Sequence, residues 1–89
     1  MMEETREFRG ISKRLAANYL GNLGGERLED AGDRIEGEGW AAELTERKVN
    51  PITGANITLN EVRIEFRGEE ARLRPLMDRF AQKAMRAGG

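Results

Sequence analysis

The sequence predicts an α+β fold, a two-layer sandwich in which two helices cover one face of an antiparallel sheet. In several short segments apolar and charged residues alternate, which is typical of antiparallel strands with one face open to water. In two longer segments apolar residues recur at steps of three and four, which is typical of amphipathic helices. The segments follow one another in the order β-α-β-β-β-α, so two apolar helix stripes are available to cover the apolar side of the sheet.

The chain begins with an expected strand over residues 4–11, followed by a helix over residues 13–23. Gly10 ends the strand, and Ser12 is a favourable N-cap for the helix. The pair Gly24-Gly25 is the expected stop, because glycine accepts the left-handed conformation there. The apolar stripe of the helix comprises Leu15, Ala16, Tyr19, Leu20 and Leu23.

Three more strands are expected in the middle of the chain. A short one covers residues 34–37, and a turn or bulge at Glu38-Gly39 leads into another over residues 40–49. The last covers residues 57–66, and we expect an irregularity near Asn60-Glu61 because the inward parity of the apolar residues changes there.

The last helix lies within residues 69–89 and has the longest apolar stripe of the chain. The stripe comprises Leu73, Leu76, Met77, Phe80, Ala81 and Ala84. Because Pro75 cannot donate a backbone hydrogen bond, the helix either begins near Pro75 after one preceding turn or bends there. We expect it to hold to about Met85, which leaves Arg86 to Gly89 as a short tail.

The large apolar residues on the inward strand faces and on the last helix should form the core. They are Trp40, Leu44, Ile64, Phe66, Leu76 and Phe80. We interpret Trp40 as a packing residue that fills the space above Gly37 or Gly39, where the sheet lacks side chains. Stacking of Trp40 on a ligand is the alternative.

Composition limits the classes of function. The length of 89 residues predicts a single domain, residues 1–89, with a short C-terminal diglycine tail. Cysteine and histidine are absent from the sequence, which removes the usual metal ligands, thiol nucleophile and general base. We therefore expect no enzyme activity, no cofactor and no metal site. The net charge of −1, the interspersed charges and the lack of a long apolar stretch predict a cytoplasmic monomer that binds neither nucleic acid nor membranes.

The charged side of the predicted sheet, called the open face below, is the first candidate binding surface. By alternation it carries Glu7, Arg9, Glu36, Glu38, Glu43, Thr45, Arg47, Arg63, Glu65 and Arg67. One interpretation is a solvated face of cross-strand ion pairs. The other is a docking surface for a protein partner, with contacts from Arg9, Arg47, Arg63 and Arg67. The face offers no exposed aromatic residues on which RNA bases could stack.

The second candidate site is Gly88-Gly89, at the end of the sequence. Two glycines form a slender arm that can enter a narrow catalytic channel, where ATP can adenylate the carboxylate. The acyl-adenylate can then pass to a sulfur donor as a thiocarboxylate or to a lysine as an isopeptide. A helix stop or the end of an excised domain would produce the same two residues.

Five segments carry a resemblance to a small family that also occurs as the C-terminal domain of MoaD-related proteins. They are FRGISKRLA (8–16), YLGNLGG (19–25), EGEGW (36–40), EVRIEF (61–66) and FAQKAMRAGG (80–89). The resemblance implies a TATA-binding-protein-like α/β fold. The diglycine ending resembles that of the small archaeal modifiers, which are ubiquitin-like proteins used in protein tagging or sulfur transfer. That likeness implies an E1-like activating enzyme and target proteins as partners.

Two hypotheses about function follow. The first is a diglycine-tailed modifier or sulfur carrier in which Gly89 supplies the reactive carboxylate. The second is a non-catalytic protein-interaction domain associated with molybdopterin or sulfur metabolism. A ubiquitin-like β-grasp fold opens with a β-hairpin, whereas this chain opens with one strand and a helix. The element order therefore argues against ubiquitin homology, although the terminus suggests similar chemistry.

Overall fold

The computed structural model of the chain describes residues 1–27, 33–50, 54 and 56–88. Its elements in chain order are β1 (Met2–Arg9), α1 (Lys13–Asn22), β2 (Glu26–Arg27), β3 (Arg34–Gly37), β4 (Trp40–Val49), β5 (Leu59–Gly68) and α2 (Glu70–Gly88). The fold class is α+β, as the sequence predicts. The short strand β2, which pairs with β3, was not anticipated because two residues cannot display an alternating pattern.

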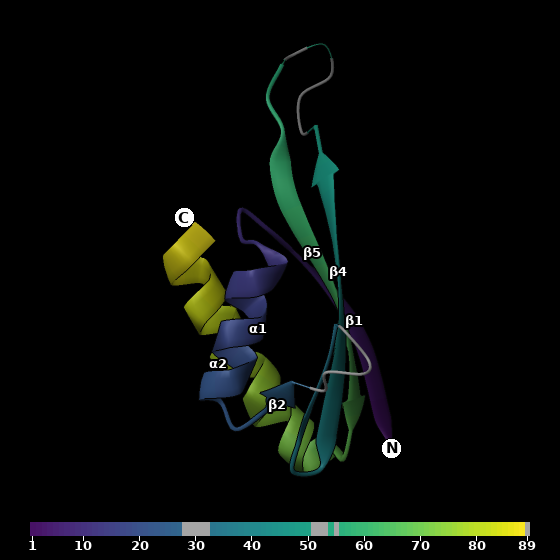
Figure 1. Cartoon of the computed structure of the whole chain (residues 1–89). Coiled ribbons are helices and arrows are strands. Elements are labelled where there is room, and N and C mark those ends of the chain that lie inside the picture. Colours follow the sequence, from purple (N-terminus) through teal and green to yellow (C-terminus); the bar gives the residue numbers. More distant parts are fainter. Residues whose placement is uncertain (28–32, 51–53, 55, 89) are drawn as a thin grey trace.

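The strands form one antiparallel sheet in the order β1-β5-β4-β3-β2. β1 lies at one edge, and the connection through α1 takes the chain to β2 at the opposite edge (Figure 1). Pairing of β1 with β5 ends at Arg9 and Glu61, whereas β4 and β5 stay paired as far as Val49 and Leu59. This continuation of β4 and β5, called the arm below, projects beyond the rest of the sheet.

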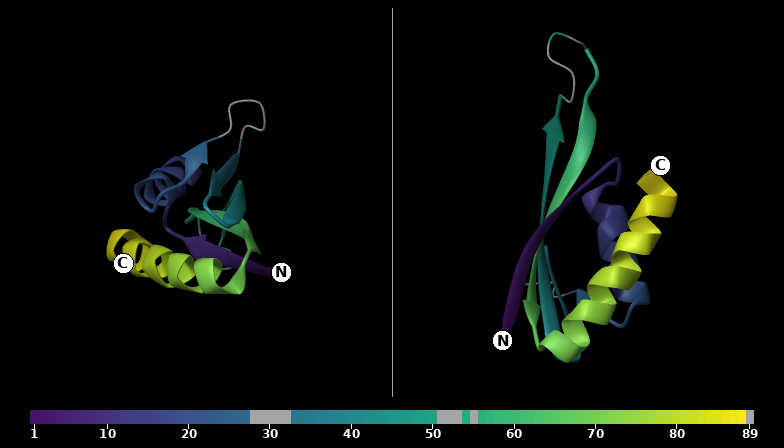
Figure 2. Two further views of the ribbon diagram at one scale, coloured as in Figure 1. Left: turned by 90° about the horizontal axis from the view of Figure 1, so that it is seen from below. Right: turned by 180° about the vertical axis from the view of Figure 1, so that it is seen from behind.

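Both helices cover the same face of the sheet and run in opposite directions (Figures 1 and 2). Phe80 of α2 joins the two layers. The centroid of its ring lies 4.9 Å from the ring centroid of Phe8 and 6.1 Å from the ring centroids of Tyr19 and Phe66. The residues predicted to form the core are all buried: Trp40, Leu44, Ile64, Phe66, Leu76 and Phe80. The periodicity of the sequence therefore identified the inward-facing side chains correctly.

Trp40 is a packing residue, and the glycines beside it make room for its indole. In the sheet Trp40 lies opposite Gly37 on β3 and Gly68 on β5. A Cβ atom added at Gly37 would lie 2.1 Å from the indole Cε2 atom, which is far shorter than a van der Waals contact. Gly37 is therefore the glycine under the ring, and the expectation that Trp40 fills the space above it is confirmed. At Gly39 an added Cβ would instead meet the side chain of Arg72.

Local signals set the bounds of α1. The Ser12 hydroxyl accepts a hydrogen bond of 3.1 Å from the backbone N–H of Leu15, which caps the first turn. At the other end Gly24 has a φ of 101°, and the N–H of Gly25 donates to the carbonyl of Leu20 at 2.9 Å. This arrangement satisfies a carbonyl that the helix leaves free, so the glycine pair ends α1 as predicted.

The expected irregularity in β5 is wrong. β5 pairs with β4 in unbroken register from Leu59 to Gly68, and Glu61 pairs with both neighbouring strands. The apparent change of parity arises because Ile57 and Leu59 are exposed, at 50% and 38% of their surface. In this unbroken register Leu59 lies on the same face as Glu61 and Arg63, which the helices do not cover, and Ile57 precedes the strand.

The expected bounds of α2 also need correction. The helix begins at Glu70 and holds Pro75 in its interior, so neither a start near Pro75 nor a four-residue tail describes it. Ala71, whose carbonyl would otherwise accept from residue 75, is exposed, so water can satisfy this carbonyl. At its C-terminal end the helix continues to Gly88, and Gly89 lies outside the described residues.

Candidate functional site

The four arginines predicted as a partner surface lie on the open face, on three neighbouring strands. Arg9 ends β1, Arg47 lies in β4, and Arg63 and Arg67 lie in β5. All four are exposed, and Arg63 and Arg67 alternate with the buried residues that face the helices. The alternation in the sequence therefore assigned them to the correct face.

Glu38, which was assigned to the open face, is an exception. It lies in the two-residue turn between β3 and β4 rather than in a strand. Its Oε1 atom is 3.6 Å from Nη2 of Arg72, so it faces the beginning of α2. A turn residue has no fixed parity, which is why alternation misplaced it.

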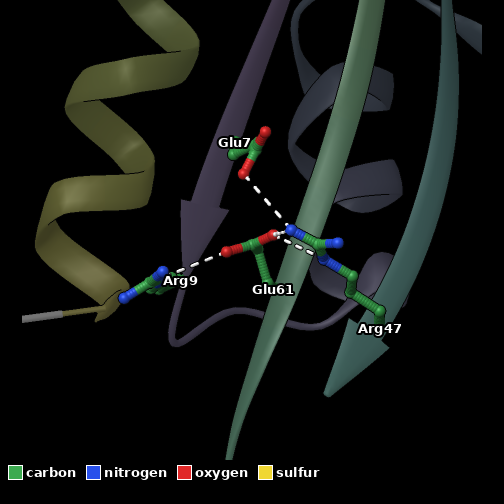
Figure 3. A network of polar contacts seen from close by, with 4 residues as sticks. All are labelled: Glu7, Arg9, Arg47 and Glu61. Carbon is green, nitrogen blue, oxygen red and sulfur yellow. Dashed lines mark hydrogen bonds and ion pairs between the residues drawn. The ribbon is translucent and has the colours of Figure 1, made fainter. Parts of the chain in front are cut away.

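The structure gathers two of the predicted arginines around Glu61 (Figure 3). Arg9 Nε donates to Glu61 Oε2 at 3.0 Å, and Arg47 Nε donates to Oε1 at 2.8 Å. Arg47 Nη2 lies 2.7 Å from the same Oε1 and 3.7 Å from Oε2 of Glu7. Only 1% of the Glu61 side chain is exposed, so its carboxylate is enclosed between the two arginines although it lies on the open face.

Electrostatics hold Glu61 in its charged form. Hydrogen bonds from Arg9 and then from Arg47 lower the pKa of the Glu61 carboxyl from its ordinary value of 4.5, against the opposing effect of burial. A carboxyl with a lowered pKa and two fixed guanidinium partners has no proton to give near neutral pH. The group therefore links β1, β5 and β4 at the base of the arm and does not have the properties of a general acid.

Sequence reasoning missed Glu61, although a signal for it exists. The alternation from Arg67 through Glu65 to Arg63 reaches Glu61 without interruption. The assumed irregularity at Asn60-Glu61 removed it from the open face. Its burial could not be foreseen, because it depends on Arg9 and Arg47, which are distant in sequence.

Arg63 and Arg67 are separate from this cluster and from each other. Arg67 Nε lies 2.9 Å from Oε1 of Glu3, which is directly opposite on β1. Arg63 makes no ion pair with any residue that the structure describes. The predicted partner surface is thus three locations: an occupied cluster, one paired arginine and one unpaired arginine.

The diglycine site lies on the other layer of the molecule. Gly88 is the last residue of α2, whose C-terminal end is on the side of the sheet opposite the open face (Figure 1). Ala84 is the last buried residue of this helix in the described part of the chain, and Met85 is 73% exposed. Gly88 and the open face are therefore on opposite sides of the sheet.

Neither a metal centre nor a membrane span is found in the part of the chain that the structure describes. Within it, no three carboxylates or other potential ligands gather as a metal site would need. No described helix is both long and apolar enough to cross a bilayer.

Comparison with known proteins places the chain in a family. A family model described as archaeal MoaD-like protein matches residues 4–89, which is nearly the whole sequence. A search of curated proteins finds no match. The match covers both helices and the whole of the sheet except the first residues of β1. The chain belongs to the archaeal MoaD-like protein family.

Proposed function

We propose that this protein is a diglycine-tailed sulfur carrier or protein modifier, activated at the carboxylate of Gly89 by an E1-like enzyme. The observation that carries the proposal is membership of the MoaD-like family over residues 4–89, a match that extends through Gly88-Gly89. The protein itself acts as the carried group, while ATP and the activating enzyme supply the chemistry. Its partners are that enzyme and a sulfur donor or target protein.

Activation and transfer are two successive nucleophilic substitution reactions. First, an oxygen of the Gly89 carboxylate attacks the α-phosphorus of ATP and displaces pyrophosphate, which gives an acyl-adenylate. In the second step a hydrosulfide ion attacks the acyl carbon and displaces AMP, which leaves a thiocarboxylic acid that ionises at neutral pH. If a lysine amine attacks instead, AMP leaves, the nitrogen loses a proton and an isopeptide bond forms. Neither step needs a side chain of this protein, because the enzyme positions both reactants.

The described geometry requires the last turn of α2 to open before the terminus can enter a channel. Met85 and Arg86 are exposed, and Ala84 is the last residue known to contribute to the core. Opening the helix after Ala84 therefore costs backbone hydrogen bonds of a terminal turn, which open readily, but no described core contact. Five extended residues reach about 17 Å, which is enough to cross the wall of an enzyme active site.

Mass spectrometry of the protein isolated from its native cells tests the proposal. The intact mass shows whether the natural chain ends at Gly89 and whether one oxygen has been replaced by sulfur. Peptide mapping shows whether lysines of other proteins carry the C-terminal peptide. We expect at least one of these products, and we expect deletion of Gly88-Gly89 to abolish it while the circular dichroism spectrum stays unchanged.

The control is an Arg74→Gln protein, because Arg74 is exposed, pairs only with Glu70 among the described residues and lies on the first turns of α2. It should form the same product as the parent. A natural chain that ends at Gly89 but shows neither product under any growth condition would refute activation. The protein would then be the non-catalytic interaction domain of molybdopterin or sulfur metabolism, which the unpaired Arg63 on the open face favours as the second candidate.

A further inference from the structure

The two layers of the molecule differ in charge. The whole chain has 15 basic and 16 acidic residues, yet α1 and α2 together carry seven basic and two acidic ones. On the sheet, Arg6, Arg34 and Arg67 are each paired with a glutamate. On α2, by contrast, Arg79 and Arg86 have no ion pair with any described residue. The unneutralised positive charge is therefore concentrated on the helical layer.

Four of the basic residues form a stripe along α2. Arg72, Arg79, Lys83 and Arg86 follow at steps of seven, four and three, so they lie within about 60° of one another around the helix axis. The stripe is about 21 Å long at the rise of an α-helix. It runs on the side of α2 that faces α1, because Lys83 lies 5.8 Å from the ring centroid of Tyr19. We call it the basic stripe.

A pocket of about 370 Å³ opens at the beginning of the basic stripe, between the end of α1, the β3–β4 turn and α2. Its apolar lining includes Leu23, Trp40 and Leu76. Arg72 and Arg79 stand beside them, and Glu38, which pairs with Arg72 at 3.6 Å, also lines the pocket. Trp40 retains 8% exposure. The pocket thus combines an apolar floor with two guanidinium groups about two helical turns apart.

We propose that the pocket and the basic stripe bind an acidic polypeptide segment that carries large apolar side chains at its centre. One apolar side chain enters the pocket. A carboxylate on one side of it pairs with Arg79, and a carboxylate on the other side takes the place of Glu38 at Arg72. Arg86 extends the same charge toward the end of α2 and suits a longer acidic surface on the partner. This binding goes beyond the proposed function, since it needs no reaction at Gly89.

Charge complementarity selects an acidic partner, and the lining of the pocket selects a polypeptide. Desolvated contact with an apolar anchor is how protein interfaces gain most of their binding energy. A single-stranded nucleic acid would need aromatic rings on which its bases could stack. Of the aromatic residues beside the basic stripe, Trp40 is 8% exposed, and Tyr19 is only partly exposed and has Lys83 above its ring.

Nuclear magnetic resonance of the full ¹⁵N-labelled chain tests this inference, with a blocked peptide of sequence Glu-Glu-Leu-Phe-Glu-Glu as the probe. We expect shifts of the Trp40 indole N–H and of the amides of Leu23, Ala71 and Arg79, with little change on β1. Arg79→Glu should weaken binding about tenfold, because it removes an attraction and adds a repulsion of similar size. Replacing Leu-Phe in the peptide by Ser-Ser should remove binding.

Arg74→Glu is the matched control, because it changes the net charge equally but lies on the other flank of α2, beside Glu70. It should leave the affinity within about twofold. Equal losses in Arg74→Glu and Arg79→Glu would reduce the interaction to nonspecific attraction and overturn the inference. So would unchanged affinity of the Ser-Ser peptide, or an absence of shifts around the pocket at millimolar peptide.

Two further arms separate this inference from its alternatives. An octauridylate that binds more tightly than the peptide and shifts the same signals would assign the basic stripe to nucleic acid instead. The chain that lacks Gly88-Gly89 should bind the peptide as the full chain does. Failure to find a thiocarboxylate or conjugate therefore leaves the docking inference standing, and failure of the peptide to bind leaves the activation proposal standing.

Discussion

Glu61 shows how the environment of one residue changes its role. If Glu61 were exposed like the other glutamates of the open face, it would contribute little to the stability of the fold, because exposed ion pairs are weak. Its position between Arg9 and Arg47 removes it from solvent and gives both of its oxygens a guanidinium partner. The negative charge of Glu61 is necessary for the stability of this cluster, because without it the two enclosing arginines repel each other.

We predict that Glu61→Gln lowers the melting temperature at pH 7, since a neutral amide leaves Arg9 and Arg47 uncompensated. The pKa of Glu61 is lowered in the folded state, so its contribution is complete above its ordinary value of 4.5 and is lost as the pH falls through the folded-state pKa. The difference in melting temperature between the two proteins should therefore shrink in acid. Thermal melts followed by circular dichroism between pH 7 and pH 3 measure it.

Glu65→Gln is the control for this prediction. Glu65 lies on the same strand and face, opposite Glu43, and makes no ion pair within the described part of the chain. Its loss should leave the melting temperature unchanged or slightly raised. A similar decrease in both variants would show that general charge, and not the enclosed carboxylate, explains the effect.

At the scale of the elements, glycines mark two different requirements. Gly37 in β3 leaves space for the indole of Trp40, so here the limit is steric. Gly21 lies in α1 with no atom within 4 Å of an added Cβ, so nothing in the packing requires a glycine there. The two positions allow the same substitution to be compared in a strand and in a helix.

Gly37→Ala should destabilise the fold by about 1–3 kcal/mol, because the methyl group displaces Trp40 from its place in the core. Gly21→Ala should stabilise it by about 0.5–1 kcal/mol, because alanine restricts the unfolded chain and favours the helix. Chemical denaturation followed by tryptophan fluorescence measures both. If Gly37→Ala were as stable as the parent with an unshifted emission maximum, Trp40 would not occupy the space over Gly37.

At the scale of the whole molecule, one ring connects the two layers. Phe80 is fully buried and contacts rings from β1, β5 and α1. In contrast, the arm and the basic stripe lie at the periphery, where substitutions do not reach the core. The packing between the layers is therefore the main source of stability, and Arg63, Arg67 and the basic stripe lie outside it.

Phe80→Ala should cost about 3–5 kcal/mol of unfolding free energy, which is a large part of the stability expected for a small domain. Met85→Ala on the same helix should change it by less than about 0.5 kcal/mol, because that side chain is 73% exposed. Urea denaturation of both variants provides the comparison. Equal midpoints would mean that α2 does not pack through its apolar stripe.

The features that depend on local periodicity could be predicted from the amino-acid sequence. Alternation and helical spacing identified the core residues from Trp40 to Phe80, because burial imposes a period of two on strands and 3.6 on helices. Ser12 and Gly24-Gly25 marked the ends of α1, because capping involves only neighbouring residues. The assignment of Arg9, Arg47, Arg63 and Arg67 to the open face rests on the same alternation.

Features that depend on which segments become neighbours could not be predicted in this way, because they arise from the folded arrangement of the chain. Glu61 is enclosed because β5 lies between β1 and β4, and no local pattern states the order of strands. Leu59 is exposed because the unbroken pairing of β5 with β4 places it on the open face, on the same side as Glu61 and Arg63. The charges look evenly mixed along the chain, yet most arginines of the sheet pair with a glutamate, whereas Arg79 and Arg86 on α2 pair with no residue that the structure describes. Neutralisation acts through space over a few ångströms, so the fold determines which charges remain.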